Sequence, residues 1–478
     1  MEPAPGFDRC RTLTFLLLIL FGAISTAQGQ ELPTAEGLPR PLELLPVRPV
    51  LPPSLPGAER LGPDSPIRLL PLAPLVETIG PLRIQAFATI EEEFTDNVNQ
   101  TKTDRKSEFR TSFAPGLSAR VERPWTTINF VYNPRYFLPG NRPDAATLDH
   151  YLTLRSTWQP SPRLRLGLAE DFTRSTDFRD VEDLGTRRTG TAGFLTNRST
   201  LEAAYVPPNG RIGLSYSNVL QRNDAPEADN SLTHTMRTDG LVTNPSLNLG
   251  GSYTLARGEF DIASPYWEHS VDAQATRTLT PTVSASLSGL FIFHDPDRDP
   301  NVMIGRTRLG STGAFGPYGS LRAEVGIAVF APQNDTTKVL PGILLNWSQQ
   351  FALLTVSATY QQDYQANFQQ VTSTGVTFTR SAGLALTSSG LLFRDLTAAL
   401  TGQWVENSYQ LTVPGLNGVS AGTVDRTWNL GVEIRYLMLR ALSLVLGYTT
   451  TIRTSTDPTV EFLENRVRLG LTYQYDIF

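Results

Sequence analysis

Cysteine is almost absent from this chain of 478 residues, which has one cysteine and four histidines. The single cysteine, Cys10, precedes the apolar segment Phe15–Ile24, and we expect it to be removed together with that segment. A mature chain without cysteine has no disulfide framework and no thiolate chemistry. Four scattered histidines also leave little material for a metal site.

Long apolar runs and a large excess of charge are missing too. No stretch of 18 or more apolar residues predicts a transmembrane helix. The formal net charge is −5 and charged residues make up 18% of the chain, so we expect no nucleic-acid partner, which would need clustered basic residues. This charge is low for a soluble surface, whereas the slightly polar mean hydropathy does not suit a helical membrane protein. A barrel with an apolar outer side and a wet interior reconciles the two.

The first 27 residues have the pattern of a secretory signal peptide. A basic start at Arg9 leads into the apolar segment Phe15–Ile24, and small residues follow it. We predict cleavage after Ala27, with Gly29 as the alternative. A membrane anchor is the competing interpretation, but the apolar segment is shorter than the ~20 residues that a spanning helix needs.

Residues 28–82 form a proline-rich zone, in which 13 of the 35 prolines fall between residues 31 and 82. Proline fixes φ and removes a backbone donor, so such a segment favours extended, polyproline-like conformations over a sheet. We predict a disordered periplasmic linker. The alternative is a docking segment for a periplasmic partner or the cell wall.

From residue 83 to 478 the polarity alternates with period two. In the segment 163–168, Leu164, Leu166 and Leu168 alternate with Arg163, Arg165 and Gly167. Successive side chains of a strand point to opposite faces, so each such segment has one apolar and one polar face. About twenty segments (18–20) show this pattern, and most are about 9–13 residues long, which suits a tilted strand that crosses a bilayer.

The connections between these segments alternate between short and long. Tight turns are predicted near 159–162 and 206–210, and longer loops near 176–192, 332–339 and 406–424. Outer-membrane barrels have short periplasmic turns and long extracellular loops, and an even strand count places both termini in the periplasm. The fold class predicted is all-β, a single closed antiparallel transmembrane β-barrel in the bacterial outer membrane, surrounded by lipid and lipopolysaccharide.

The last predicted strand, near 463–477, carries a targeting pattern. Its apolar face runs from Val467 to Tyr475 and the chain ends at Phe478. An amphipathic final strand with a terminal aromatic residue resembles the signal that the barrel-assembly machinery recognises. Phe478 is out of phase with that apolar face, so the signal is imperfect.

Three short motifs near the start of the barrel carry a family resemblance. They are Glu91–Asn97, with the sequence EEEFTDN, then Phe113–Leu117, FAPGL, and Tyr132–Tyr136, YNPRY; Trp158 and Leu164–Leu166 follow in the same order. The order is similar to the beta-barrel porin 2 family, whose relatives include barrels associated with exopolysaccharide and exosortase systems. The resemblance covers about the first five strands and implies a porin-like barrel.

No constellation of residues indicates an enzyme. Gly213–Ser217 lacks the second glycine of a nucleophile elbow and lies in the middle of a predicted strand. The four histidines, which are His150, His234, His269 and His294, are expected to be solvated residues near strand ends. The acidic segment Asp295–Asp299 lacks the turn glycine and distal glutamate of a calcium loop, so we interpret it as a plain surface loop, and we expect no cofactor.

Charged side chains on the polar phase of the predicted strands are the candidate site residues. A charge that faces lipid at mid-bilayer costs ~2–4 kcal/mol for Arg or Lys, so these side chains should face the lumen. They either form ion pairs that stiffen the wall or line a partly cationic path for anionic or sugar-like solutes. The candidates are Arg155, Arg163, Arg165, Asp171, Arg211, Arg322, Glu324, Glu433, Arg435, Arg466 and Arg468.

The function that the sequence favours is a porin-like passage across the outer membrane. Its more specific form is an export route for exopolysaccharide or another envelope product. A structural or docking protein of an envelope assembly, without transport, is the alternative. A barrel of about 20 strands is wider than the 16–18-stranded porins, whose lumen holds an aqueous channel, so its own lumen is either water-filled or plugged.

Deletion of residues 31–80 should leave a barrel that still assembles, because a proline-rich segment contributes few sheet hydrogen bonds. The measurement is heat-modifiable gel mobility of outer-membrane fractions, with the full chain alongside. A truncated protein that fails to reach the outer membrane would place this segment within the fold or its assembly.

Overall fold

The computed structural model describes the barrel part of the chain. The described residues are 82–140, 146–176, 193–224, 229–316, 318–367, 375–390, 393, 395–411 and 422–477. The predicted signal peptide and all of the predicted linker except Leu82 lie outside these residues, as do Phe478 and most of the predicted loop 176–192. Leu82 is the first residue of the first strand.

Twenty strands, each 12 to 16 residues long, form a single antiparallel sheet. Their bounds are β1 Leu82–Thr95, β2 Glu108–Arg123, β3 Thr126–Pro139, β4 Thr147–Ser161, β5 Leu164–Ser175, β6 Phe194–Tyr205, β7 Gly210–Asn223, β8 Ser231–Thr243, β9 Leu247–Phe260, β10 Tyr266–Thr280, β11 Val283–Pro296, β12 Val302–Phe315, β13 Gly319–Pro332, β14 Lys338–Gln350, β15 Leu354–Asn367, β16 Gly375–Ser389, β17 Leu396–Leu411, β18 Val424–Leu439, β19 Leu442–Ser455 and β20 Phe462–Asp476.

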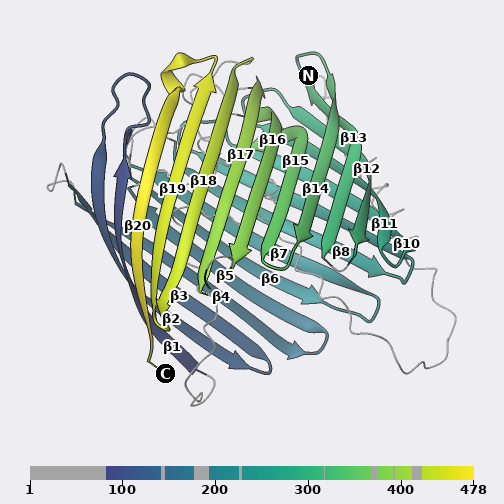
Figure 1. Ribbon diagram of the computed structural model, residues 1–478. Coiled ribbons are helices and arrows are strands. Elements are labelled where there is room, and N and C mark those ends of the chain that lie inside the picture. Colours follow the sequence, from purple (N-terminus) through teal and green to yellow (C-terminus); the bar gives the residue numbers. More distant parts are fainter. Residues whose placement is uncertain are drawn as a thin grey trace. The chain divides into compact units, whose positions relative to one another are not determined.

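The sheet closes on itself through its first and last strands (Figure 1). β1 pairs with β20 from Gln85↔Asp476 to Thr95↔Arg466, while its other edge pairs with β2. Every other strand pairs with its two neighbours along the chain. Closure gives every strand a partner on both sides, which is the condition for a sheet to cross lipid.

Short and long connections alternate around the barrel, as the sequence predicts. The turn between β4 and β5 has two residues and that between β2 and β3 also has two, whereas β1 and β2 are separated by residues 96–107. All short turns lie at the end that carries the start of β1 and the end of β20. We call this the short-turn end and the opposite one the long-loop end.

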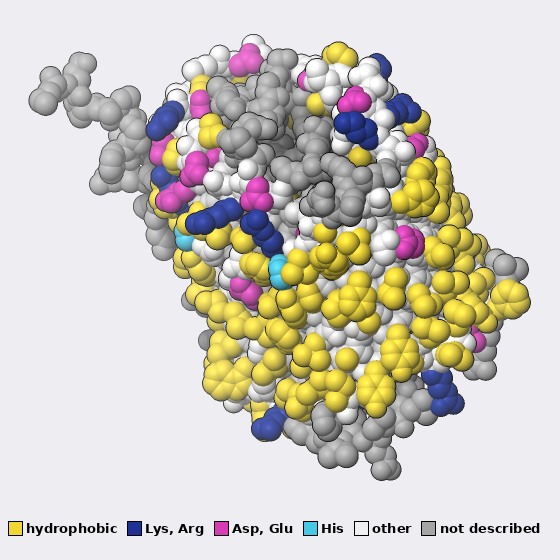
Figure 2. All heavy atoms as spheres, turned by 90° about the vertical axis from the view of Figure 1, so that its left-hand side faces the viewer, with side chains coloured by type: hydrophobic (Ala, Val, Ile, Leu, Met, Phe, Trp, Pro, Cys, Tyr) yellow, Lys and Arg dark blue, Asp and Glu magenta, His cyan; other side chains and the backbone are white. Residues whose placement is uncertain are grey.

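Each strand presents an apolar face outward. On β18 the exposed side chains include Trp428, Leu430, Val432, Ile434 and Tyr436, which all belong to one phase. Figure 2 shows one side of the barrel with a broad apolar band, above which charged side chains gather at the long-loop end. Exposure of so many large apolar side chains in one band requires lipid around them.

The barrel is therefore an outer-membrane barrel, with its short turns in the periplasm and its long loops outside the cell. Among the residues that the structure describes, no helix is long and apolar enough to cross a membrane.

The strands are longer at the long-loop end than the sequence predicts. β17 continues to Leu411, although residues 406–424 were expected to be a loop. Glu406 and Ser408 lie on its outward phase, and Glu406 accepts hydrogen bonds from Arg380 and Arg426 at 2.9 and 2.7 Å. An outward glutamate is tolerated there because that end of the strand projects beyond the hydrocarbon. Period-two hydrophobicity therefore stops where the lipid stops, before the strand itself ends.

The seam between β1 and β20 is reinforced by polar contacts at the long-loop end. Asp96 accepts two hydrogen bonds from Asn465 at 2.7 and 2.6 Å. Gln100 donates to Glu464 at 2.7 Å, and Lys102 forms an ion pair with Glu461. The hydrogen bond from Lys102 lowers the pKa of the partly exposed Glu461 carboxyl. These contacts join the first and last connections of the barrel.

Leu166→Arg should disturb assembly more than Arg165→Leu. Leu166 lies on the outward phase of β5, three residues from the short-turn end, where a charge that faces lipid costs less than the ~2–4 kcal/mol of the midplane, whereas Arg165 lies on the opposite face. Heat-modifiable mobility and urea unfolding in lipid vesicles measure the difference. If both variants behave alike, the register is slipped by one residue, which would exchange all side chains between the two faces.

Candidate functional site

The inward phase of the strands carries ion pairs between neighbouring strands. Arg155 on β4 binds Asp171 on β5 at 2.6 Å, and both side chains are more than 40% exposed. Arg211 on β7 lies 3.8 Å from Asp239 on β8. Each pair joins adjacent strands across the wall. The candidates Arg155, Asp171 and Arg211 are therefore all engaged with a charge of opposite sign.

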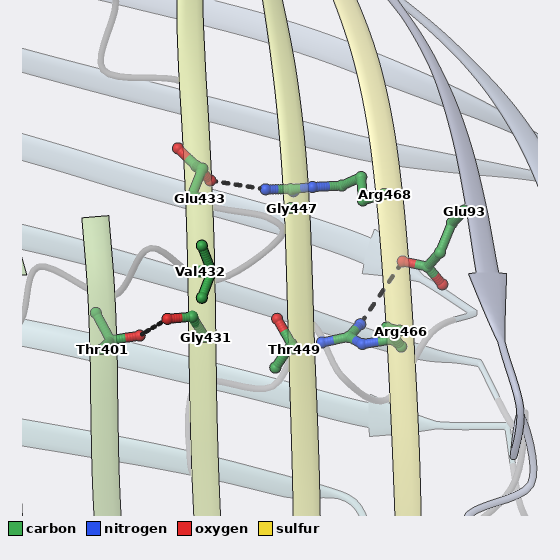
Figure 3. Close-up of a pocket in the computed structure, with 9 residues that line it drawn as sticks. All are labelled: Glu93, Thr401, Gly431, Val432, Glu433, Gly447, Thr449, Arg466 and Arg468. Carbon is green, nitrogen blue, oxygen red and sulfur yellow. Dashed lines mark hydrogen bonds and ion pairs between the residues drawn. The ribbon is translucent and has the colours of Figure 1, made fainter. Parts of the chain in front are cut away.

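A second group of candidates lies together beside the seam, in the recess that Figure 3 shows. Arg468 on β20 donates to Glu433 on β18 at 2.9 Å and lies 3.6 Å from Glu91 on β1. Arg435 donates to the same Glu433 at 3.2 Å. The Arg468 side chain passes over Gly447 on β19 to reach Glu433 (Figure 3), and a Cβ at Gly447 would come within 3.4 Å of it.

Five candidates remain, which are Arg466, Arg322, Glu324, Arg165 and Arg163. Arg466 lies 3.7 Å from Glu93 in the same recess. Arg322 donates to Glu324 at 2.7 Å on β13. Arg165 is exposed on the inward phase of β5, whereas Arg163 lies in the turn before that strand. Arg163 was expected on the inward phase of a strand, but that strand begins one residue later because Ser161–Arg163 closes the turn.

Burial of the inward side chains changes along the barrel axis. Toward the short-turn end they are exposed, as in Arg120, Glu122, Arg155, Thr157, Arg165, Glu202, Gln274, Thr312 and Arg322. Toward the long-loop end they are buried, as in Thr95, Glu108, Asp149, Ser175, Thr233, Glu268, His294, Phe330, Asp425, Arg453 and Glu464. The inner wall of the lumen is therefore exposed on the periplasmic side and packed on the outer side.

The packing on the outer side begins where β15 separates from β14. The ladder between these strands stops at Ile343↔Gln362, although β14 extends to Lys338 and β15 to Asn367. The end of β15 remains paired with β16 as far as Asn367↔Gly375. Pro341 lies at the point of separation and has no backbone N–H to donate. Its carbonyl oxygen accepts a hydrogen bond from the Gln362 side chain at 2.9 Å.

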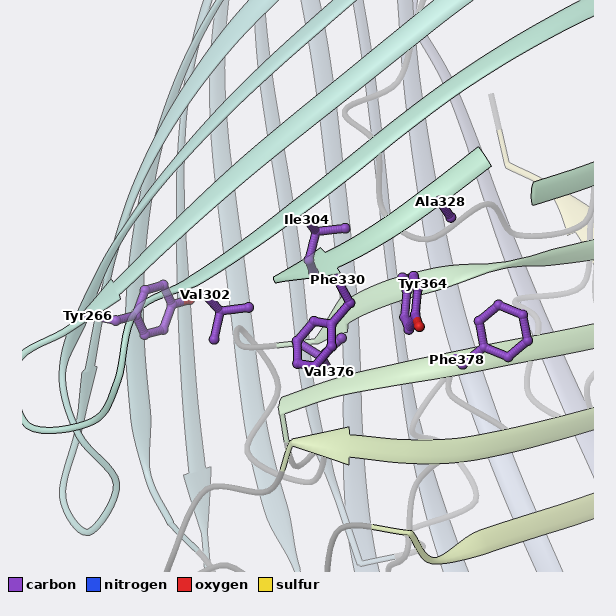
Figure 4. Close-up of a cluster of buried hydrophobic side chains, with 8 residues drawn as sticks. All are labelled: Tyr266, Val302, Ile304, Ala328, Phe330, Tyr364, Val376 and Phe378. Carbon is purple, nitrogen blue, oxygen red and sulfur yellow. The ribbon is translucent and has the colours of Figure 1, made fainter. Parts of the chain in front are cut away.

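Beyond this point the ends of β15 and β16 lie inside the lumen. Tyr364, Val376 and Phe378 belong to the outward phase of their strands, yet none is more than 5% exposed. They pack against inward side chains of β10, β12 and β13 (Figure 4). Ring centroids of Phe330 and Tyr364 are 5.6 Å apart. The side chains on the outward phase of this hairpin are thus buried against the inner wall.

A buried carboxylate fixes this inward-folded segment, which comprises residues 363–367 and 375–379. Asp363 accepts from Arg306 at 2.6 Å and from Arg308 at 2.7 Å, and its side chain is 1% exposed. Glu324 lies 3.9 Å from the other side of Arg308. Lys338 on β14 also donates to Gln410 on β17 at 2.9 Å, which bridges strands that are not neighbours in the sheet.

Sequence patterns did not identify Asp363, Arg306 or Arg308 as site residues. Asp363 continues the period-two pattern of its strand, so it looks like any inward carboxylate. The available signal was Pro341-Gly342, which interrupts a strand pattern and confines that part of a strand to a sheet edge. Only the three-dimensional pairing shows that β15 is the strand that leaves β14 there.

The histidines were expected to be solvated residues near strand ends, and the structure corrects this for His294. His294 is 5% exposed on the inward phase of β11, with its ring centroid 4.6 Å from that of Tyr266. The other three donate or accept a hydrogen bond with a tyrosine on the outer face. In the described part of the chain, no group of three His, Cys, Asp or Glu side chains is placed to hold a metal ion.

Comparisons with known proteins find solved structures of low similarity and no family. No family description and no curated protein matches the chain. The siderophore receptor PirA from Pseudomonas aeruginosa aligns with a TM-score of 0.48 at 11% identity, over 82% of this chain and 80% of that one. OccAB3 from Acinetobacter baumannii aligns at 0.41 and 8% identity, over 83% and 99%. OccK2 from P. aeruginosa, solved with glucuronate, aligns at 0.41 and 12% identity, over 83% and 98%.

Asp363→Asn should destabilise the barrel by roughly 3–5 kcal/mol, because it removes the buried carboxylate that binds the buried Arg308 and the partly buried Arg306. Urea unfolding in vesicles, followed by tryptophan fluorescence, gives the free energy. Asp171→Asn is the matched control, since its exposed ion pair contributes about 0–1 kcal/mol. Equal effects of the two substitutions would contradict the role assigned to Asp363.

Proposed function

We propose that the barrel is a porin-like passage for hydrophilic, sugar-like solutes across the outer membrane. The observation that carries this proposal is the contrast between its two faces. The outward phase is apolar, whereas the inward phase carries ion pairs, hydroxyl groups and amides that remain exposed over the periplasmic half of the lumen. A wall of that kind solvates polar solutes without desolvating its own charges.

The pairing of charges favours sugar-like solutes over simple anions. Arginines of the inner wall are mostly matched by carboxylates, as Arg155 is by Asp171 and Arg468 is by Glu433. Matched charges produce little net field, so they attract neither sign of ion strongly. They still present donors and acceptors at short spacing, and sugar hydroxyls can bind both.

Exopolysaccharide, or another envelope product, is the more specific cargo that we propose. The motifs of the first five strands suggest it, although no family description matches the chain. A width of 20 strands supports it, since it exceeds that of 16–18-stranded porins. A long polymer would cross such a lumen only as a single chain past the inward-folded segment. Secretion of the polymer by a deletion strain, restored by the wild-type chain, tests the cargo separately from conductance.

A structural or docking role is the second candidate, and the packed outer side of the lumen favours it. The inward-folded segment and the buried network at the long-loop end stiffen the barrel without contributing to transport. The two candidates differ in one measurement, which is conductance of the purified protein in planar bilayers. A folded barrel that never conducts would support the structural role.

Arg155→Gln should shift ion selectivity toward cations, because it leaves the exposed carboxylate of Asp171 less neutralised in the lumen. Asp171→Asn should shift it toward anions. Reversal potentials in a salt gradient measure both shifts, and heat-modifiable mobility confirms that each variant is folded. Two variants that leave the selectivity unchanged while the channel conducts would remove this ion pair from the solute path.

A further inference from the structure

β14 keeps an edge without a strand partner where β15 leaves it. The ladder between the two strands ends at Ile343↔Gln362, whereas β13 stays paired with the other edge of β14 as far as Phe330↔Lys338. Among the described residues, no strand pairs with Lys338–Gly342 on the side of β15. Such an edge presents backbone donors and acceptors to any strand that can align with it.

The end of β15 itself can align with this edge. If the ladder continued in its present register, Pro341 would lie opposite Tyr364 and Leu340 opposite Gln365. Tyr364 would then face outward and Gln365 inward, which is the alternation of apolar and polar side chains found in the rest of the wall. The sequence of this end of β15 therefore suits a wall strand, although Tyr364 is buried inside the lumen.

Pro341 weakens this second pairing without preventing it. Its carbonyl oxygen points to the β15 side, where it accepts the hydrogen bond from the Gln362 side chain. The nitrogen of a strand residue points to the same side as its carbonyl, and the nitrogen of proline carries no hydrogen. A continued ladder would therefore lack one donor opposite Tyr364, so the wall-paired position gains less than an uninterrupted strand would.

The contact between β14 and β17 depends on the inward-folded position. Lys338 on β14 donates to Gln410 on β17 at 2.9 Å, although β15 and β16 lie between these strands in the order of the sheet. With both intervening strands in the wall, β14 and β17 would be three strand spacings apart, or about 14 Å. The two side chains would then meet only at full extension, so this hydrogen bond belongs to the inward-folded position.

Asp363 lies at the point about which the end of β15 departs. In a continued ladder it would lie opposite Gly342, whose partner on β13 is Gly326, and Gly326 in turn pairs with Arg308 on β12. The Arg308 side chain crosses these glycines, since a Cβ on Gly342 would come within 3.5 Å of its Nε. The ion pair between Arg308 and Asp363, at 2.7 Å, can therefore persist when the residues beyond Asp363 move.

We infer that the inward-folded segment is a gate that turns about Asp363 between two positions. In the observed position it lies in the lumen, where Tyr364 and Phe378 pack on the inner wall. In the other position it pairs with the free edge of β14, and the lumen beside Phe330 is cleared. Each position satisfies contacts that the other lacks, as a two-position element requires. The inference rests on the proposed passage, because the gate opens or closes that route.

A disulfide that fits the wall-paired position tests the exchange. Leu340 and Gln365 would there form a pair without backbone hydrogen bonds, with Cα atoms about 4.5 Å apart, which a disulfide can bridge. In the observed position the Tyr364 face of β15 packs against the inner wall, and Gln365 belongs to the opposite face. The full-length variant Leu340→Cys/Gln365→Cys, in a Cys10→Ser background, is assembled under reducing conditions and then oxidised. Both thiols should be lost, as counted with a maleimide reagent after unfolding, whereas each single-cysteine variant should keep its thiol.

Removal of a contact of the observed position should speed this cross-link. Phe330→Ala takes away the ring whose centroid lies 5.6 Å from that of Tyr364, and it leaves the free edge of β14 unchanged. We expect cross-linking at least about tenfold faster than in the double-cysteine barrel alone. Phe87→Ala is the matched control, since it removes a ring of β1 that lies over Gly116, and it should change the rate by less than about twofold.

Conductance of the double-cysteine barrel in planar bilayers supplies the second readout. The cross-linked barrel should conduct more than the same barrel after reduction, because its gate is held in the wall. The gate is overturned, and the passage is not, if the cysteines stay free in folded barrels that conduct. It is also overturned if cross-linked and reduced barrels conduct alike. A barrel that cross-links but conducts in neither form contradicts the proposed passage, and the gate with it. Heat-modifiable mobility verifies that each variant is folded.

Discussion

The hydrogen bonds between β1 and β20 are the interaction on which the rest of this barrel depends. In lipid an unpaired backbone group costs several kcal/mol, so a sheet can cross a membrane only when it has no edge. Closure makes the apolar outer face and the polar inner face consequences of one alternation of side chains. The polar contacts of Asp96, Gln100 and Lys102 lie at the end of this seam, where water competes for the same groups.

The separation of β15 from β14 changes the inner wall of the lumen. Where β15 leaves β14, backbone groups lose their strand partners, and the departing segment must be stabilised in another way. Burial of Tyr364 and Phe378 on the inner wall and the double ion pair of Asp363 provide that stabilisation. The result is an inner wall that is exposed on the periplasmic side and packed on the outer side.

Period two in the sequence was enough to predict the all-β barrel, its twenty strands and the alternation of short and long connections. The prediction worked because lipid requires an apolar side chain at each outward position. It failed where that rule ends: β17 runs past the lipid with Glu406 facing out, and Phe378 is buried inside despite an outward phase. The long-range contact of Asp363 with Arg306 depends on the path of the hairpin. The local periodicity of the sequence does not predict that path.

A cysteine scan along β18 tests the central claim, that this sheet faces lipid on one side and water on the other. In a Cys10→Ser background, single cysteines at Asn429 and Arg435 should react with a charged, water-soluble thiol reagent in vesicles. Cysteines at Leu430 and Ile434 should not react, and a fluorophore attached to them in detergent before reconstitution should be quenched by brominated lipid. Equal reactivity at all four positions, or quenching at Asn429 and Arg435, would contradict the account.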